Sequence, residues 1–365
     1  MRGGEKVLEV LCELLPESDL YTLIHLPGST APIIENRRVF ASWLNRLPCV
    51  GHYYRYLLPL MPWTAGRMKL RGYDLVVAVS HCVAHGVDVE PGVRFICYCN
   101  TPMRYAWGTL NSQFPGRHRV DPRRWLLRRL GSRLRTWDVR AAQRVTEYVA
   151  NSHNVQRRIA ASYGRDSTVV YPPVDTDYYL PSKERPDSFY LWVGALAPYK
   201  RIDLALEAFR RLDRRLVVVG QGQCLRMARR NAPANVSFLG RQPDEVLRRH
   251  FSVCRALIFP GEEDFGIVPV EAQACGRPVI AFGRGGALET VVDVDKAGSG
   301  AEPTGVLFHE PTADSLVEAI RRFERVEQEF QPQAIRARAL RFSRQRCKEA
   351  LSDCLFGARQ ERSAC

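Results

Sequence analysis

The stretch that decides the fold is residues 263–271, which read EDFGIVPVE and place Glu263 and Glu271 eight positions apart. The apolar run before it, residues 256–260, predicts a buried strand, and residues 272–276 predict a short helix that ends at a glycine. The proline within the stretch favours a first helical turn, because its missing N–H costs nothing there. Glu263 is therefore expected on the loop after a strand, and Glu271 inside the helix that follows.

The start of this expected helix is a candidate anion site. Free backbone N–H groups gather there at the positive end of the helix dipole, and together they favour a phosphate or a diphosphate. A carboxylate on either side would accept hydrogen bonds from hydroxyl groups. A ligand with both a diphosphate and hydroxyls, such as a nucleotide sugar, would satisfy this pattern.

Short apolar runs alternate with helical patterns along the rest of the chain. This alternation predicts an α/β fold with doubly wound parallel sheets and helices on both faces. Strands are expected at residues 73–80, 93–99, 147–150, 168–171, 189–194, 216–220, 236–239, 256–260, 279–282 and 305–308.

The chain is long enough for two domains. A proline-bearing stretch, residues 172–187, is expected to link an N-terminal acceptor-side domain, residues 1–171, to a C-terminal nucleotide-sugar-binding domain, residues 188–331. A long helix from about residue 332 to 356, within the C-terminal segment 332–365, could cross back to the first domain.

Composition excludes several classes of protein. Of the 365 residues, 45% are apolar and 25% charged, as in globular proteins, and no stretch reaches the roughly 18 apolar residues that span a bilayer. The 11 cysteines are scattered, which indicates reduced thiols in the cytosol and mostly small core residues.

The positive charge is uneven. The net charge is +14 (53 minus 39), and residues 117–144 alone carry ten arginines against two aspartates, with Leu and Trp at helical spacing between them. A solvated helix packed on a core by its leucines would explain this pattern. Contact with an anionic membrane surface or a diphosphate-linked acceptor would also explain it. Nucleic acid is not expected as a partner, because no recognition motif accompanies the charge.

A second anion-binding corner is expected where Gly194 follows a strand and Lys200 and Arg201 precede a helix. An ordinary turn with an exposed Lys–Arg pair is the alternative. Two Asp-x-Asp pairs, residues 175–177 and 293–295, could in principle hold a metal ion, but their positions in a linker and in a solvated acidic stretch argue against it.

In the first half of the chain, Asn100, Thr101 and Arg104 follow the strand expected at residues 93–99. Ligands bind at the carboxyl ends of strands in open α/β sheets, so these side chains are candidates for contact with a substrate. A structural loop with packed aromatic residues is the alternative. His81 and His85, after the strand at residues 73–80, are further candidates.

Taken together, these segments resemble the retaining GT-B glycosyltransferases of family 4 (group 1), which build bacterial O-antigen and exopolysaccharide on lipid carriers. The similarity is nearest to the mannosyltransferase-like branch. It implies two facing Rossmann-like domains with the active site in the cleft between them. It rests on residues 1–9, 100–107, 151–152, 171–175, 198–201 and 263–271.

The resemblance also implies roles for single residues. Glu263 would contact the donor sugar, Glu271 the ribose, and Lys200 the phosphates, with Asn100 as a third catalytic residue. The other implied donor-side residues are Gly194, Arg201, Phe265, Gly266, Ile267 and Val268, the last four through their backbone N–H groups. The implied acceptor-side residues are Gly3, Gly4, Thr101 and Arg104. No metal and no other cofactor is implied.

Three features depart from the family pattern. Relatives carry a strand before the Gly3-Gly4 loop, so the first strand of the N-terminal domain is expected to be missing here. A helix is expected over residues 5–15. Relatives have His where Asn100 stands, and many have Arg at the position of Ala195. An amide such as that of Asn100 donates a hydrogen bond but does not titrate.

The expected protein is a cytoplasmic enzyme, peripheral on the inner face of the membrane. It would transfer a hexose, with mannose from GDP-mannose as the first candidate, to a lipid-linked or polysaccharide acceptor with retention of configuration. A non-catalytic paralogue that binds a nucleotide sugar or a partner, and a sugar-nucleotide epimerase, remain as alternatives.

Overall fold

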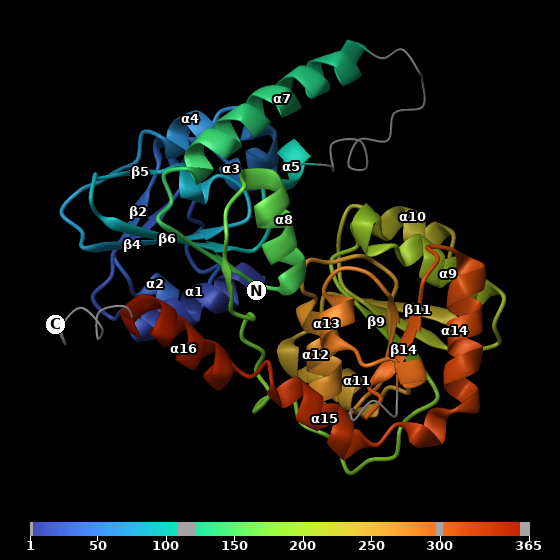
Figure 1. Cartoon of the computed structure of the whole chain (residues 1–365). Coiled ribbons are helices and arrows are strands. Elements are labelled where there is room, and N and C mark those ends of the chain that lie inside the picture. The colour runs from blue at the N-terminus through green and yellow to red at the C-terminus, as the bar shows by residue number, and fades with distance from the viewer. Residues whose placement is uncertain (1–2, 108–121, 297–301, 358–365) are drawn as a thin grey trace. The chain divides into compact units, whose positions relative to one another are not determined.

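A computed structural model describes residues 3–107, 122–296 and 302–357, with the backbone alone for residues 55 and 122–130 (Figure 1). The chain divides into two compact units. Unit 1 comprises Met1–Pro173 and Cys347–Cys365, and unit 2 comprises Val174–Arg346. Among the described residues, no helix is long and apolar enough to cross a membrane.

Unit 1 is built on a four-stranded parallel sheet with the strand order β4-β6-β7-β8. Two smaller parallel pairs, β1-β2 and β3-β5, accompany it. The strands are β1 (Leu20–Thr22), β2 (Val39–Ala41), β3 (Lys69–Leu70), β4 (Leu75–Ser80), β5 (Asp88–Val89), β6 (Arg94–Cys99), β7 (Glu147–Ala150) and β8 (Thr168–Val169).

Helices and short helical turns surround these strands in the sequence of unit 1. The α-helices are α1 (Gly3–Leu14), α2 (Pro32–Glu35), α3 (Val50–Tyr53), α4 (Met61–Ala65), α5 (Arg104–Trp107), α7 (Pro122–Ala142), α8 (His153–Tyr163) and α16 (Arg344–Ser352), the last of which begins in unit 2. The 3₁₀ turns are η1 (Trp43–Arg46), η2 (Tyr54–Leu57) and η3 (Ala84–Gly86), and a π-helical turn, η7 (Asp353–Gly357), follows α16.

Both faces of the unit 1 sheet are covered, as the continuous apolar sequence of β6 requires. Phe95 and Cys97 pack with α8, whereas Ile96 and Tyr98 pack against α1 and α16 from the two ends of the chain. The Tyr98 hydroxyl donates to the carbonyl oxygen of Val170 at 2.9 Å, so this buried polar group is satisfied. The C-terminal helix α16 therefore belongs to the core of unit 1.

The described half of α7 is fixed by a buried carboxylate. Asp138 is 0% exposed and accepts hydrogen bonds from Trp107 Nε1 at 2.7 Å and the Tyr163 hydroxyl at 2.8 Å. Its other oxygen lies 3.1 Å from Nε2 of His85, which is itself buried and contacts Ser80. His85, a candidate for contact with a substrate, is thus a core residue that joins η3 to α7. The arginines of residues 117–121 and the side chains of residues 122–130 lie outside what the structure describes.

Unit 2 is built on a six-stranded parallel sheet with the order β11-β10-β9-β12-β13-β14. The strands are β9 (Tyr190–Val193), β10 (Leu216–Val219), β11 (Val236–Gly240), β12 (Leu257–Phe259), β13 (Val279–Phe282) and β14 (Gly305–Phe308). The helices are α9 (Ile202–Arg210), α10 (Leu225–Arg230), α11 (Asp244–Val253), α12 (Ile267–Ala274), α13 (Ala287–Thr290), α14 (Ala313–Arg325) and α15 (Pro332–Leu340). The 3₁₀ turns are η4 (Pro198–Lys200), η5 (Val294–Lys296) and η6 (Glu327–Glu329).

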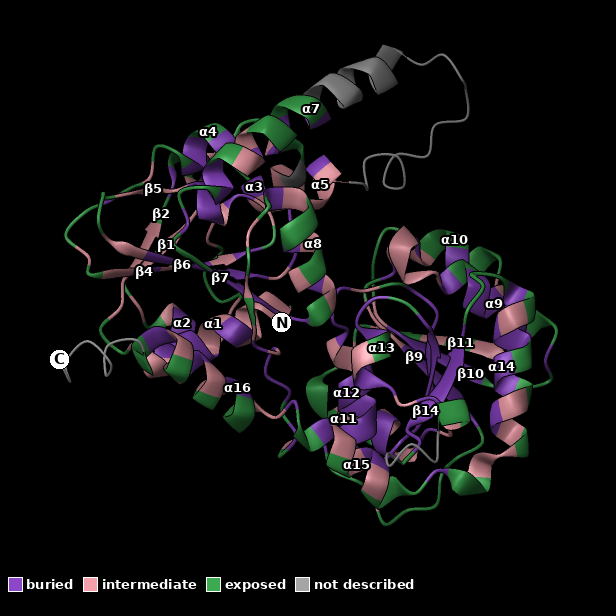
Figure 2. Cartoon of the chain, viewed as in Figure 1, coloured by how far each residue is buried: buried purple, intermediate pink, exposed green. Residues whose placement is uncertain are grey.

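The core of unit 2 lies between its sheet and helices α9 and α14, as the buried residues in Figure 2 show. Helix α14 begins where the side chain of Thr312 accepts a hydrogen bond from Ser315 N, which is an N-cap. Its buried residues Leu316, Ile320 and Phe323 recur at the spacing of one helical face. In Figure 1, α14 and α9 lie on one side of the sheet, and α11 and α12 on the other.

The sequence expectations hold for the main strands and fail in identifiable places. All ten expected strands are present, trimmed by up to two residues at their ends or, for β11, extended by one. The four that were not expected, β1, β2, β3 and β5, have only two or three residues each, which is too short for an alternation pattern.

Three further expectations are corrected. Gly3 and Gly4 form the first turn of α1, whereas a loop was expected. Residues 174–187 belong to unit 2 and are not a free linker, because Val174 N donates to Phe342 O at 3.0 Å and Tyr179 is buried. The single long helix expected at the C-terminus is broken between α15 and α16. The described residues begin at Gly3, so the expectation that the first strand of the N-terminal domain is missing falls outside them.

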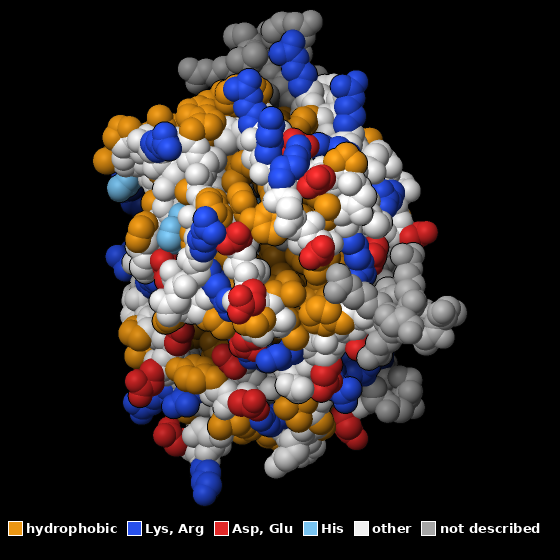
Figure 3. Space-filling view, turned by 90° about the vertical axis from the view of Figure 1, so that its left-hand side faces the viewer, with side chains coloured by type: hydrophobic (Ala, Val, Ile, Leu, Met, Phe, Trp, Pro, Cys, Tyr) orange, Lys and Arg blue, Asp and Glu red, His pale blue; other side chains and the backbone are white. Residues whose placement is uncertain are grey.

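On the face drawn in Figure 3, Lys and Arg side chains lie among Asp and Glu side chains and among exposed hydrophobic ones.

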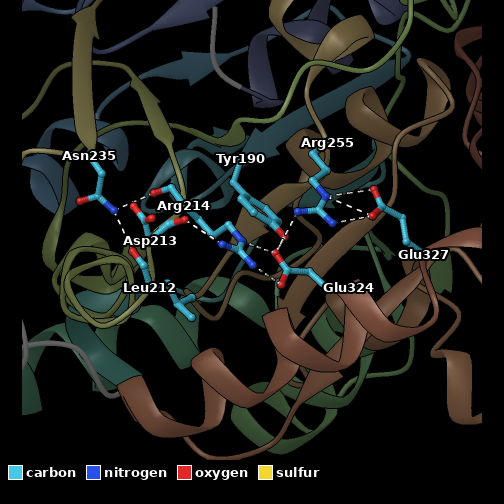
Figure 4. Close-up of polar contacts among 8 residues, drawn as sticks. All are labelled: Tyr190, Leu212, Asp213, Arg214, Asn235, Arg255, Glu324 and Glu327. Atoms are coloured by element: carbon cyan, nitrogen blue, oxygen red, sulfur yellow. Dashed lines mark hydrogen bonds and ion pairs between the residues drawn. The ribbon is translucent and has the colours of Figure 1, made fainter.

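At the amino ends of three unit 2 strands, a polar network ties the sheet to α14 (Figure 4). Glu324 Oε1 accepts from the Tyr190 hydroxyl at 2.9 Å, from Arg214 Nε at 2.7 Å and from Arg255 Nη1 at 2.9 Å. Arg255 also pairs with Glu327 at 2.6 Å. This end of the sheet is occupied by structural contacts, which leaves the carboxyl ends for a site.

Candidate functional site

The candidate site lies at the carboxyl ends of β9 and β12, where the strand order of unit 2 reverses. The strands on one side of this point follow the chain as β9-β10-β11 and those on the other as β12-β13-β14. In open α/β sheets the loops diverge at such a reversal and leave a crevice, which is where ligands bind. The loop after β9 carries Gly194 and Lys200, and the loop after β12 carries Glu263.

Lys200 and Glu263 meet at this crevice. The Lys200 ammonium contacts Oε1 of Glu263 in an ion pair whose side chains are 12% and 17% exposed. Gly194 lies beside them, since a Cβ there would lie 3.7 Å from Cδ and Cε of Lys200. The ammonium also lies 5.8 Å from the centre of the Tyr199 ring and 5.9 Å from that of Phe259. The pair is therefore largely withdrawn from water while one side stays accessible, and electrostatic interactions are stronger in such surroundings than in bulk water.

Glycines allow the loops of the site to approach this closely. A Cβ on Gly261 would lie 2.6 Å from Tyr199 O and 2.8 Å from Lys200 Cα, so only a glycine fits between the two loops. Gly286 N donates to Glu263 O at 2.9 Å, and a Cβ on Gly286 would lie 2.2 Å from Phe265 O. The glycine-rich loop after β13 thus packs on the backbone of the Glu263 loop and fixes its shape.

The start of α12 follows directly after Glu263. Its N-cap is Gly266, in the left-handed region at φ 81°, and no side chain caps the helix. Phe265 anchors the loop, because its ring packs edge to face against the ring of Phe342 with the ring centres 5.5 Å apart. The helix start, with Ile267 and Val268 in its first turn, has the geometry that suits an anion.

The second glutamate lies deeper in the same unit. Glu271 belongs to the second turn of α12 and is 6% exposed. Burial, together with the charge of Glu271, raises the pKa of the Tyr179 hydroxyl and that of the Cys275 thiol, the latter to about 12. Arg201, expected on the donor side, is the N-cap of α9 and pairs with Asp203 at 3.0 Å.

The candidate residues of unit 1 gather at the carboxyl end of β6. Gly4 lies beside Asn100, because a Cβ on Gly4 would lie 3.2 Å from Asn100 Nδ2. That Nδ2 atom is buried and has no hydrogen-bond partner among the described residues. The backbone of Asn100 is fixed, since its N–H donates to Ser80 O at 2.8 Å and its carbonyl oxygen accepts from Asn151 Nδ2 at 3.0 Å.

The other acceptor-side candidates differ in their surroundings. The Thr101 side chain is buried and donates to the carbonyl oxygen of Pro102 at 3.2 Å, so its hydroxyl is already satisfied. Arg104 begins α5 and is half-buried. Gly3 lies in the first turn of α1. The structure thus brings Gly4 and Asn100 together, whereas Thr101 serves the packing of the loop.

Among the described ranges, no cluster of three or more His, Cys, Asp or Glu side chains could hold a metal ion. Of the second Asp-x-Asp pair, Asp293 and Asp295 both bind Arg322, at 3.0 and 2.7 Å. Sequence reasoning missed the part played by Gly261 in the site. Its position directly after a buried strand was the available signal, but only the tertiary structure shows which backbone approaches it.

Both halves of the chain match known families. Residues 1–178 match the family described as Glycosyltransferase Family 4, and residues 181–339 match Glycosyl transferases group 1. A D-inositol 3-phosphate glycosyltransferase from Kineococcus radiotolerans is 32% identical over 221 residues, which are 50% of this chain and 49% of that protein. The chain spans about half or less of the length of the curated relatives it matches.

Solved structures share the fold over nearly the whole chain. Sucrose-phosphate synthase from Thermosynechococcus elongatus superposes with a TM-score of 0.70 at 18% identity, covering 99% of this chain and 92% of that one. HepE from Anabaena, solved in complex with UDP, gives a TM-score of 0.67 at 18% identity and covers 98% and 96%. The expected GT-B architecture of two doubly wound α/β units is confirmed. Because residues 1–178 match the one family and residues 181–339 the other, the protein belongs to the group 1 and family 4 glycosyltransferases.

Proposed function

We propose that the protein transfers a hexosyl group from a nucleoside-diphosphate sugar to a lipid-linked saccharide or polysaccharide, with retention of configuration. The observation that carries this proposal is the Lys200–Glu263 pair beside the start of α12, at the reversal of strand order in unit 2. A cation, a helix start and a carboxylate at one crevice match the diphosphate and the hydroxyls of such a donor.

The proposed mechanism is electrostatic. The bond between the sugar C1 and the diphosphate oxygen breaks, and the negative charge that develops on the diphosphate is stabilised by Lys200 and by the N–H groups at the start of α12. Glu263 accepts hydrogen bonds from sugar hydroxyls. The acceptor oxygen bonds to C1 on the face that the diphosphate leaves, and its proton passes to the departing phosphate. No metal is assigned to these steps.

On the acceptor side, Asn100 is the residue proposed to meet the reacting sugar. Its buried Nδ2 can donate a hydrogen bond that no described residue accepts, which supports a contact with substrate. An amide donates without changing charge, so Asn100 would position the sugar and would not act as an acid or base.

The donor is best identified by a panel of UDP-, GDP- and ADP-sugars in thermal-shift format, since a ligand that binds only the native state raises its apparent stability. The resemblance to the mannosyltransferase-like branch favours GDP-mannose, whereas the structure of HepE was solved with UDP. Transfer to a lipid-linked saccharide is then measured with the donor that binds, and the anomeric configuration of the product tests retention.

The name of one relative, a D-inositol 3-phosphate glycosyltransferase, supports a second class of acceptor. A small phosphorylated polyol should therefore be assayed beside the lipid-linked saccharide. If product forms only with the polyol, the acceptor is the polyol and not the lipid-linked saccharide. The assignment of the donor would be unaffected.

Two substitutions test the chemistry. Lys200→Met should lower kcat/KM about 100- to 1,000-fold, as expected for the loss of one group that stabilises developing charge. Glu263→Gln should lower it about 10- to 100-fold, because it replaces a charged hydrogen-bond acceptor by a neutral one. Glu262→Gln is the matched control, since its side chain is exposed one position away, and it should retain full activity.

Unchanged transfer in both Lys200→Met and Glu263→Gln would refute the proposed site. Binding of a nucleotide sugar without transfer or hydrolysis would favour the non-catalytic paralogue. Formation of an isomeric nucleotide sugar without any acceptor would favour the epimerase.

A further inference from the structure

Asn151 lies directly after β7, the strand that neighbours β6 in the unit 1 sheet. The last residues in register between these two strands are Cys99 and Ala150, so Asn100 and Asn151 are the first residues beyond the paired strands. Asn151 is only 6% exposed. A polar side chain that is buried to this extent needs hydrogen-bond partners, and Asn151 finds them on both sides of its amide.

The nitrogen of this amide holds the backbone of Asn100. Asn151 Nδ2 donates to the carbonyl oxygen of Asn100 at 3.0 Å, and the backbone N–H of Asn151 donates to the carbonyl oxygen of Cys99 at 3.3 Å. One residue therefore binds two successive carbonyl groups at the point where β6 ends and the chain bends. Towards β4, the strand on the other side of β6, the N–H of Asn100 donates to Ser80 O at 2.8 Å. The Asn100 backbone is thus held from both neighbouring strands.

The oxygen of the amide fixes its orientation. Asn151 Oδ1 accepts from the Ser152 hydroxyl at 3.0 Å, and the oxygen of that hydroxyl accepts from Val155 N at 3.1 Å as the N-cap of α8. Because a carbonyl oxygen only accepts hydrogen bonds, the amide must turn its NH₂ group towards Asn100. Ser152 and Val155 are both fully buried, so this chain of hydrogen bonds is anchored in a packed helix.

The backbone of Asn100 in turn limits the directions that its side chain can take. Its Nδ2 atom is buried, and a Cβ on Gly4 would lie 3.2 Å from it, so α1 confines the side chain on one side. A change in backbone direction at Asn100 would therefore move this donor atom. A displacement of about 1 Å in a positioned group can lower a rate about 100-fold.

We propose that Asn151 is a positioning residue for glycosyl transfer, which directs the Asn100 amide to the reacting sugar by holding the Asn100 carbonyl group. It acts through Asn100 and is assigned no contact with the substrate. This inference rests on the proposed function, in which Asn100 contacts the transferred sugar. An Asn151 that only satisfied a buried carbonyl group would support stability and would leave the turnover of the folded enzyme unchanged.

Two substitutions remove the hydrogen bond. Asn151→Asp keeps the shape of the side chain but presents an oxygen, which repels the Asn100 carbonyl oxygen. Asn151→Ala removes the amide altogether and replaces the first variant if the buried carboxylate prevents folding. Either substitution should lower kcat for transfer about 10- to 100-fold.

The binding of the donor should change little, because the nucleotide is proposed to bind unit 2. The KM for the donor should stay within about threefold of the wild-type value. The thermal shift produced by UDP, GDP or ADP, whichever corresponds to the donor that binds, should equal that of the wild type.

The matched control is Gln156→Ala on α8. Gln156 is half-buried, and its Nε2 donates to Ser167 O at 2.6 Å, so this variant also removes a hydrogen bond from a side-chain amide to a backbone carbonyl, here directly before β8. It should keep the kcat and KM of the wild type. Circular dichroism and melting temperatures show that each variant is folded under the conditions of the assay.

A double-mutant cycle with Asn100→Ala separates positioning from packing. If Asn151 acts through Asn100, adding Asn151→Asp to Asn100→Ala should change kcat less than about twofold. Equal losses from Asn151→Asp in the wild-type and Asn100→Ala backgrounds would overturn the proposal. Full activity in Asn100→Ala would also overturn it.

The outcomes also separate this inference from the proposed function. A folded wild-type enzyme that transfers no sugar from any donor would refute the proposed function, and the inference would fall with it. Transfer by the wild type together with a wild-type kcat in the folded Asn151 variants would refute the inference alone.

Discussion

The candidate site depends on a few residues whose spacing along the chain does not show that they meet. Lys200 and Glu263 are 63 positions apart and form an ion pair, because both follow strands that neighbour each other in the sheet. Gly261 lies between their loops, where any side chain would meet the backbone of residues 199 and 200. A single Cβ at this position is therefore expected to disturb the site more than many larger changes at the surface.

Gly261→Ala tests this close approach. Its Cβ would have to push back the backbone of Lys200, so the free energy of unfolding should fall by about 1–3 kcal/mol, the usual cost of overpacking. The thermal shift produced by the donor nucleotide should also shrink. Gly66→Ala is the control, because the nearest atom to its Cβ would be 3.5 Å away, in ordinary contact. Unchanged stability and donor binding in Gly261→Ala would show that the two loops are not held in contact.

In unit 2, the amino ends of the strands carry structural contacts and the carboxyl ends carry the candidate site. At the amino ends, Glu324 of α14 binds residues at the starts of β9, β10 and β12. Burial alone would raise the pKa of Glu324, but hydrogen bonds from Arg214 and Tyr190 and the charge of Arg255 outweigh it and lower the pKa. The polar network thus lies at one end of the sheet, and the loops of the candidate site lie at the other.

Glu324→Gln should lower the free energy of unfolding at neutral pH by about 1.5–3 kcal/mol, the range for hydrogen bonds to a charged group. The folded pKa lies below the unfolded one, so the stabilisation is complete above the unfolded value of about 4.3 and is lost as the pH falls through the folded value. The difference in the free energy of unfolding between wild type and variant should therefore become smaller at acidic pH. Urea unfolding over a range of pH measures both effects.

Glu318→Gln is the control on the same helix. Glu318 pairs with Arg325 at 2.8 Å, and both side chains are about three-fifths exposed, so little change is expected. The stabilising role of Glu324 would be contradicted if both substitutions lowered the free energy of unfolding equally. It would also be contradicted if the loss caused by Glu324→Gln did not vary with pH.

At the scale of the molecule, the chain forms two units with separate cores, and each unit carries its own candidate residues. The donor-side residues lie in unit 2, and Asn100 lies in unit 1. A bound nucleotide should therefore slow hydrogen exchange in unit 2 and leave it unchanged in unit 1. The complete reaction is nevertheless proposed to use residues of both units.

Hydrogen exchange checks this division of tasks. At a nucleoside diphosphate concentration about 100 times its Kd, exchange of the backbone N–H groups at residues 194–200 and 266–268 should slow by up to about 100-fold. Residues 43–67 of unit 1 should exchange at an unchanged rate. Protection that is spread evenly over both units, or absent from residues 266–268, would contradict the placement of the donor site.

Much of the fold follows from local sequence. Buried parallel strands read as continuous apolar runs, and for this reason the main strands of both sheets could be predicted from the chain alone. The strands of two or three residues could not be predicted, because they carry no pattern. Residues 172–187, expected to be a linker, are a further example. Their prolines mark a break in regular structure but do not reveal that Val174 forms a bridge with Ser343.

The sequence by itself determined the class of fold, the family resemblance and the two glutamates that frame a helix start, because each of these is written in neighbouring residues. Only the tertiary structure decided that Lys200 pairs with Glu263, that His85 is sequestered by Asp138, and that Asn151 binds the carbonyl oxygen of Asn100. The physical reason is the same in each case. Strand order and helix packing choose which distant side chains meet, and no short stretch of sequence records that choice.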